Sequence, residues 1–207
     1  MLRKVSVFIT AAAIIACGSA RAQDAGSASG AGPGVVEVTV IPAGAAFFSS
    51  KSSAPSFGNY GLGTAVTYNI NRVIGVEGEF GAMISTTSDL QFGDLNRHTK
   101  APNFMSYNVN AIVTAASVGA ARVYAAGGIG GLTMFERAGL GVTGDTTFLA
   151  GNVGGGVKWY AANSRWGLRG DYRLVVNRSS DTAPSFFGTE SRYGHRLYAG
   201  VIVNAAR

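Results

Sequence analysis

Charged side chains occupy every second position in two stretches of the sequence. Glu77 and Glu79 are separated by one residue, and Arg169, Asp171 and Arg173 repeat that spacing. Residues two apart lie on the same face of a β-strand, so each stretch predicts a strand with one charged face. Because buried charges persist only when they are paired, and the two signs nearly balance, we predict an ion-pair network between such faces and favour a structural polar core over a gated ion path. The predicted members are Glu77, Glu79, Lys158, Arg169, Asp171, Arg173 and Arg196, with Glu37 as a further candidate.

The two histidines, His98 and His195, are all that an acid–base enzyme could draw on by the usual route. His98 stands in a predicted loop beside Asp94 and Arg97, and such mixed charge is typical of a solvated segment. Residues 139–144 match the Gly-x-Gly-x-x-Gly pattern of nucleotide-binding loops, but no helix is expected after them. We therefore predict no catalytic, cofactor-binding or metal-binding residue, no cofactor and no enzymatic activity.

The charged stretches belong to a repeated pattern of eight segments in which apolar and polar residues alternate, as they do in half-buried strands. The segments 73–84, 104–116 and 166–177 alternate most cleanly, each with one apolar and one polar face. In the Gly-rich fifth and sixth segments the alternation is weak, and there we place Asn152 and Lys158 on the polar face. The predicted strands cover residues 35–48, 59–71, 73–84, 104–116, 121–135, 146–160, 166–177 and 193–205.

The connections between these segments alternate between short and long. The short ones are 71–72, 116–120 and 161–165, and the long ones are 49–58, 85–103, 136–145 and 178–192. Short turns at one end and long loops at the other are what up-and-down membrane barrels show. We predict an all-β fold, an eight-stranded antiparallel up-and-down transmembrane β-barrel. Two aromatic girdles are expected, with Tyr68, Trp159, Tyr160 and Trp166 near the short turns and Phe47, Phe48, Tyr60, Tyr107, Phe135, Phe148 and Tyr193 near the long loops.

The composition indicates which solvent the apolar faces meet. Of the 207 residues 47% are hydrophobic and only 14% are charged, against roughly 25% in a soluble domain. A soluble barrel must carry polar residues outside, whereas lipid as the outer solvent accounts for the shortage of charge. No run reaches the 18 or more apolar residues of a membrane helix, so the chain is expected to enter a membrane as strands.

The N-terminal residues predict export. A basic start at 2–4, an apolar stretch at 5–16 and Ala-Arg-Ala at 20–22 form a signal peptide with a cleavage site. The alternative is a lipoprotein signal in which Cys17 is acylated. Cleavage would remove three basic residues and lower the formal charge from +6 to +3, and the remaining basic residues are scattered, so nucleic acid is not a predicted partner. The predicted division is a signal peptide at 1–22, a flexible Gly/Ser-rich leader at 23–34 and a barrel domain at 35–207.

On these features the chain resembles the family of small outer-membrane β-barrels with an OmpA-like transmembrane domain. The similarity covers residues 35–207 and is most evident in FLAGNVGGGVKWY, the short turn after it, RWGLRGDYRLVV and the final strand RLYAGVIVNAA. The resemblance implies a place in the bacterial outer membrane, insertion by the outer-membrane assembly machinery, and contact with outer-membrane lipid and lipopolysaccharide. A monomer is expected.

The expected role follows from the size of the barrel and from its loops. Eight strands leave an interior just wide enough for side chains, so we predict a filled polar interior and no open general-diffusion pore. Phe57, Phe92, Phe186 and Phe187 are predicted as exposed loop aromatics that contact lipopolysaccharide or a host surface. The predicted role is therefore structural, adhesive or one of surface interaction.

Two alternative functions stay open. The first is a lipid-modifying enzyme similar to the lipid A deacylases, for which His195 lies on the outward face. Leu197 stands where the serine nucleophile of such an enzyme is expected. The second alternative is a soluble secreted β-barrel that binds a small ligand.

Overall fold

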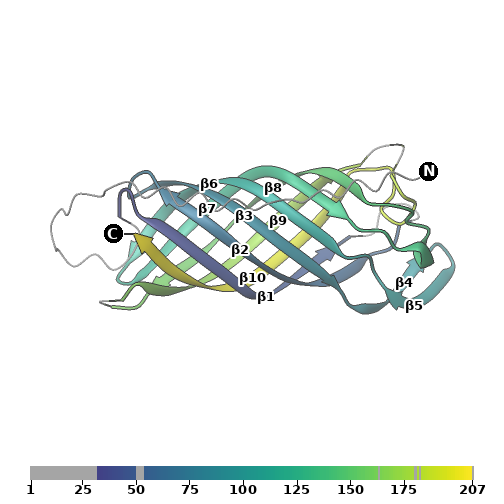
Figure 1. Ribbon diagram of the computed structural model, residues 1–207, viewed down its shortest axis with the longest axis horizontal. Coiled ribbons are helices and arrows are strands. Elements are labelled where there is room, and N and C mark those ends of the chain that lie inside the picture. Colours follow the sequence, from purple (N-terminus) through teal and green to yellow (C-terminus); the bar gives the residue numbers. More distant parts are fainter. Residues whose placement is uncertain (1–31, 50–53, 163, 180, 182, 207) are drawn as a thin grey trace, which may run out of the picture.

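A computed structural model describes residues 32–49, 54–162, 164–179, 181 and 183–206 (Figure 1). The predicted signal peptide, Cys17 and most of the predicted leader lie outside these residues. Consecutive long strands pair with each other, and β1 pairs with β10 to close an antiparallel barrel. The described residues contain no helix that is long and apolar enough to cross a membrane. The barrel strands are β1 (Val36–Phe48), β2 (Phe57–Asn69), β3 (Ile74–Ser85), β6 (Phe104–Val118), β7 (Ala121–Met134), β8 (Thr146–Tyr160), β9 (Trp166–Arg178) and β10 (Arg192–Ala206).

The eight predicted segments are confirmed, and their ends differ from the observed strands by no more than two residues. Two further elements lie inside predicted loops. Strands β4 (Thr87–Phe92) and β5 (Leu95–Lys100) form a hairpin between β3 and β6, turned by Gly93 with φ of 57°. A 3-10 turn, η1 (Ala138–Leu140), lies between β7 and β8. The hairpin strands are short and mostly polar and η1 has only three residues, so neither element carries a periodic signal of its own.

The predicted facing of the strands is also confirmed. Val76, Phe80 and Ile84 of β3 are exposed on the outer wall, while Glu77 and Glu79 between them are buried. The same alternation runs through β6 and β9. The barrel therefore has an apolar outer wall and a polar lining, which is the arrangement that a lipid solvent requires.

Glycines explain why β7 and β8 alternate only weakly. Gly154 of β8 points inward, and a Cβ there would overlap the carbonyl oxygen of Tyr172 on β9. Gly128 and Gly130 of β7 are similarly tight against the backbone of β6. Close approach of neighbouring strands, rather than burial, decides the residue type at these positions.

A β-bulge interrupts β1. The register shifts between Val40 and Ala43 on the β10 side and between Ile41 and Gly44 on the β2 side, around Pro42. Proline has no backbone N–H to donate to a neighbouring strand. In a closed barrel without edge strands, it therefore fits only where a bulge interrupts the pairing.

The connections lie as predicted, with short turns at one end and the long loops at the other (Figure 1). Asn71 shapes the β2–β3 turn, because its side-chain oxygen accepts hydrogen bonds from the backbone N–H groups of Val73 and Ile74 at 2.8 and 2.7 Å. The hairpin β4–β5 stands beyond the barrel at the long-loop end.

Three residues predicted in the aromatic girdles are instead inside the barrel. Tyr160, Phe48 and Phe148 are all buried, so this part of the prediction is wrong. Phe48 follows Phe47 and Tyr160 follows Trp159, and of two consecutive strand residues only one can face outward. The outward members of the two girdles are Tyr68, Trp159 and Trp166 at the turn end and Phe47, Tyr60, Tyr107, Phe135 and Tyr193 at the loop end.

Candidate functional site

Across the middle of the barrel interior, the described residues include four acidic and four basic side chains, none more than 8% exposed. We call this set the interior network. It includes all seven residues named from the sequence, together with Glu37. Its members are Glu37, Glu77, Glu79, Asp171, Lys158, Arg169, Arg173 and Arg196.

Glu77 of β3 lies at the centre of the network. Its carboxylate accepts two hydrogen bonds from Arg169 and one from Arg173 at 3.3 Å, both on β9. It also accepts hydrogen bonds from the Thr67 hydroxyl at 3.0 Å and the Asn110 amide at 3.2 Å. Five donors on a single carboxylate stabilise its ionised form and tie β2, β3, β6 and β9 together across the barrel.

Asp171 is the second carboxylate of the central group. It accepts hydrogen bonds from Arg169 at 2.8 Å and from Arg173 at 2.7 Å, and it also accepts one from the Tyr124 hydroxyl. Arg173 also donates a hydrogen bond to the side-chain oxygen of Asn152 at 2.8 Å. Each guanidinium therefore bridges the same two carboxylates, Glu77 and Asp171, so the four charges form one compact cluster.

Two further ion pairs flank this cluster. Lys158 pairs with Glu37 at 2.5 Å, and Tyr160 donates to the same carboxylate at 2.7 Å. Arg196 pairs with Glu79 at 2.7 Å, and the Tyr198 hydroxyl donates to Glu79 at 3.3 Å. In this way every acid of the network has a basic partner, as burial of charge demands.

A small cavity of about 20 Å³ adjoins the Arg196–Glu79 pair, lined by Ser106 and Met83 among others. Nε and Nη2 of Arg196 and Oγ of Ser106 are buried without a hydrogen-bond partner among the described residues. A cavity of this size holds one water, which could bridge such groups.

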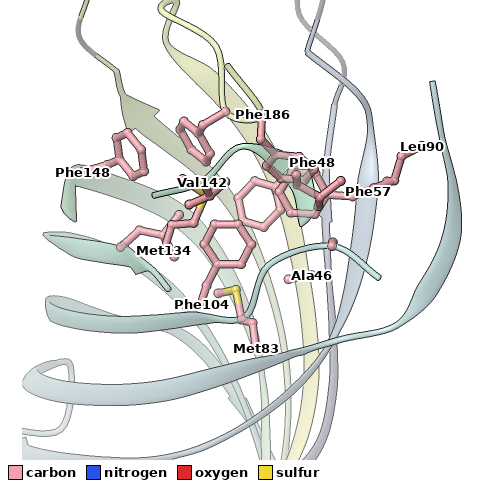
Figure 2. Packing of buried hydrophobic residues seen from close by; sticks show 14 of the residues in the cluster. Ala46, Phe48, Phe57, Met83, Leu90, Phe104, Met134, Val142, Phe148 and Phe186 are labelled. Atoms are coloured by element: carbon pink, nitrogen blue, oxygen red, sulfur yellow. The ribbon is translucent and has the colours of Figure 1, made fainter. Parts of the chain in front are cut away.

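The long-loop end of the interior is apolar. The largest buried hydrophobic cluster lies there, and its phenylalanine rings converge on the barrel mouth from several strands and loops (Figure 2). Phe57 is central, with ring centroids 4.9 Å from Phe48, 5.3 Å from Phe104 and 5.0 Å from Phe186. We call this set the mouth cluster; it comprises Ala46, Phe48, Phe57, Met83, Leu90, Ala101, Phe104, Leu132, Met134, Leu140, Val142, Phe148, Ala150, Phe186 and Phe187.

The mouth cluster overturns the prediction that Phe57, Phe186 and Phe187 are exposed. All three are buried, and Phe92 packs against the cluster from the β4–β5 hairpin. Phe57 is the first residue of β2, two residues before the predicted start of the strand. Continuing the inward register of Asn59 by one step would have placed Phe57 inside the barrel.

Arg192 ties the loops to the mouth cluster and was not predicted from the sequence. It is fully buried at the start of β10, with its guanidinium 4.7 Å from the ring centroid of Phe57. It donates hydrogen bonds to the carbonyl oxygens of Phe186 and Phe187 at 3.1 Å and to that of Pro55. One side chain thus joins the β9–β10 loop to the β1–β2 loop.

The two histidines lie apart from the interior. His98 on the hairpin pairs with Asp89 at 2.8 Å, and both are exposed. His195 lies on the outer wall, where its Nδ1 is 2.7 Å from the Tyr172 hydroxyl and Leu197 also faces outward. The part of the chain that the structure describes contains no group of three or more His, Cys, Asp or Glu side chains able to hold a metal.

A closed antiparallel barrel with an apolar outer wall and a charged lining defines a membrane β-barrel protein. The family model of the outer-membrane protein β-barrel domain matches residues 9–202, so the chain belongs to that family. Both the family and the fold point to the bacterial outer membrane.

Solved structures agree on the fold. Neisserial surface protein A, from Neisseria, has 16% identity and a TM-score of 0.55, and the match covers 82% of this chain and 96% of that one. The outer-membrane protein OprG from Pseudomonas aeruginosa has 16% identity and a TM-score of 0.50, with 86% and 99% of the two chains covered. Among curated proteins, none matches the chain.

Proposed function

We propose that this protein is a closed outer-membrane barrel whose loops form a preorganised surface for contact outside the cell, and that it is neither a general pore nor an enzyme. The proposal rests on two layers of side chains that cross the lumen. The interior network crosses the middle of the barrel, and the mouth cluster crosses its loop end. A permeant solute would have to separate paired buried charges and then stacked aromatic rings.

The mouth cluster also supports a surface role. Phe186, Phe187, Leu140 and Val142 come from loops, and their burial holds those loops in one arrangement. The β4–β5 hairpin projects beyond them with an exposed polar face that carries Asp89, His98 and Lys100. A binding surface that is already ordered loses less conformational entropy when a partner binds.

The remaining parts of the proposal concern location and assembly. We propose export through residues 1–22, insertion by the outer-membrane assembly machinery, and a monomer surrounded by lipid and lipopolysaccharide. If the protein has no enzymatic activity, lipid A from cells that contain the protein has the same mass as lipid A from cells that lack it. A mass change that depends on His195 would instead favour the lipid-modifying alternative.

Single-channel recording in planar bilayers tests the closed lumen. The purified chain is expected to give no steady conductance, and Phe57→Ala is expected to raise the frequency of openings because Phe57 contacts three other rings. A steady open channel in the unmodified protein would refute closure.

Adherence measurements test the surface role. Bacteria that express the full chain are compared with bacteria in which residues 87–100 are replaced by a short Gly-Ser turn, at matched surface levels. The surface role predicts weaker adherence to host cells without the hairpin. Equal adherence would show that the hairpin has no part in such contact.

A further inference from the structure

The outer wall of the barrel is hollowed over β2, β3, β6 and β7. A groove of about 380 Å³ lies there, and its outward-facing lining residues are Thr64, Val66, Phe80, Tyr107, Val109 and Ile129. It lies on the side of the barrel opposite β9, since β3 and β9 are four strands apart in the closed order of eight.

A missing side chain produces the groove. Gly78 faces outward between Val66 on β2 and Val109 on β6, which are its partners in the ladder. A Cβ at Gly78 would meet no atom within 4 Å, and its φ is in the ordinary range, so neither space nor conformation requires glycine there. The glycine leaves a gap between Val76 and Phe80 in the row of outward apolar side chains along β3.

Tyr107 forms a fixed wall of the groove. It lies opposite Phe80 on one side and Gly131 on the other, and its ring occupies the space that a side chain at Gly131 would need, 2.5 Å from the position of a Cβ. The ring therefore leans toward β7 and away from β3. Because residue 131 is glycine, Tyr107 can lean over it, and the space above Gly78 stays open.

The groove offers almost nothing to a polar ligand. Its two outward hydroxyls are those of Thr64 and Tyr107; Oγ1 of Thr64 already donates to the carbonyl oxygen of Thr39 at 2.9 Å, and the Tyr107 hydroxyl lies over Gly131 of β7. Every other outward lining side chain is aliphatic or aromatic.

The occupant follows from the surface with which the groove is continuous. It is a depression in the apolar wall that this family of barrels turns toward membrane hydrocarbon. We propose that the groove at Gly78 seats one acyl chain of a membrane lipid, held longer than the lipid around the rest of the barrel. A chain in the groove contacts protein on its floor and both sides, which increases dispersion contacts over a flat wall. This inference rests on the outer wall facing lipid and not on closure of the lumen.

Photo-crosslinking tests the proposal. The full mature chain is placed in nanodiscs of phosphatidylethanolamine and phosphatidylglycerol with a trace of phosphatidylethanolamine that carries a diazirine in the middle of one acyl chain. Cross-linked residues are mapped by mass spectrometry on the groove and on the opposite wall around Gly170. Labelling of the groove is expected to exceed that of the opposite wall by roughly three- to tenfold, because the lipid's acyl chain is better packed in the groove than in the surrounding hydrocarbon.

Two glycine variants provide the test and its matched control. Gly78→Leu fills the groove and should bring its labelling down to that of the opposite wall. Gly170→Leu changes the equivalent outward glycine of β9, where a Cβ also meets nothing within 4 Å, and should leave the groove labelling unchanged. If Gly78→Leu does not fold, as judged by heat-modifiable gel mobility, Gly78→Ala should still lower the labelling.

Three results would overturn the proposal. The first is equal labelling of the two walls in the unmodified protein, which would mean an ordinary lipid annulus. The second is groove labelling that survives filling at residue 78. The third comes from a separate experiment: a disulfide between two copies of a Val109→Cys variant would make the groove a protein interface.

Discussion

Replacing Glu77 by glutamine tests the interior network where its contacts are most concentrated. The side chain keeps its shape but loses its charge, and the network then holds three acids against four bases. Arg169 and Arg173 retain Asp171 as their remaining common carboxylate. An amide nitrogen also replaces one of the two oxygens that together accept five hydrogen bonds.

The expected loss is set by the unpaired charge that remains. Removing one partner of a buried ion pair typically destabilises a protein by 3–5 kcal/mol. Because Asp171 still compensates part of the positive charge, we expect about 3 kcal/mol for Glu77→Gln. The control is Glu136→Gln, the same chemical change on an exposed loop, which should stay within about 0.5 kcal/mol of the unmodified chain.

Urea unfolding in detergent micelles, followed by circular dichroism, measures both changes. Adding Arg169→Met to Glu77→Gln restores three charges of each sign, so the double variant should lose less stability than the two single losses combined, by about 1–3 kcal/mol. Equal unfolding midpoints for Glu77→Gln and Glu136→Gln would refute the claim that Glu77 lies in a paired, closed interior.

Other predictions concern the mouth cluster and the strand contacts. Phe57→Ala should lower the free energy of unfolding by about 3–5 kcal/mol, the usual loss for a buried ring, whereas Phe47→Ala on the outer wall should lower it far less; equal losses would contradict the burial of Phe57. Arg192→Met should expose the β9–β10 loop to chymotrypsin or proteinase K in intact cells, because the carbonyl oxygens of Phe186 and Phe187 lose their donor; an unchanged digest would show that other contacts hold the loop. Gly154→Ala should destabilise the barrel by about 1–3 kcal/mol because its methyl group overlaps the Tyr172 backbone, while Gly170→Ala should be nearly neutral, and the reverse order in urea unfolding would mean a different β8–β9 contact.

The period of two in the sequence made most of the barrel predictable. Alternation in β3, β6 and β9 determines which side chains face inward, and therefore Glu77, Asp171 and Arg173 could be assigned to one interior before any pairing was known. Pairing itself could not be predicted. Glu77 and Arg169 are 92 residues apart, and their contact depends on how the strands are staggered around the barrel, which no local pattern specifies.

The mouth cluster was missed for a related reason. Phe186 and Phe187 lie in a loop without periodicity, so only tertiary contacts decide whether they are buried. Arg192 gave no signal either, since an arginine beside Tyr193 at a strand end is equally compatible with an exposed rim. The β4–β5 hairpin contains charged and polar residues on its outer face, and this resembled an ordinary solvated loop.

Fluorescence quenching of the two tryptophans tests most directly whether the outer wall faces lipid. Trp159 and Trp166 lie together on that wall at the short-turn end, 43% and 47% exposed, and the protein has no other tryptophan. The chain is reconstituted into phosphatidylcholine vesicles brominated either near the headgroup or near the end of the acyl chain. A girdle position predicts strong quenching by the shallow bromines and weaker quenching by the deep ones. Emission unchanged by either lipid would contradict a membrane barrel.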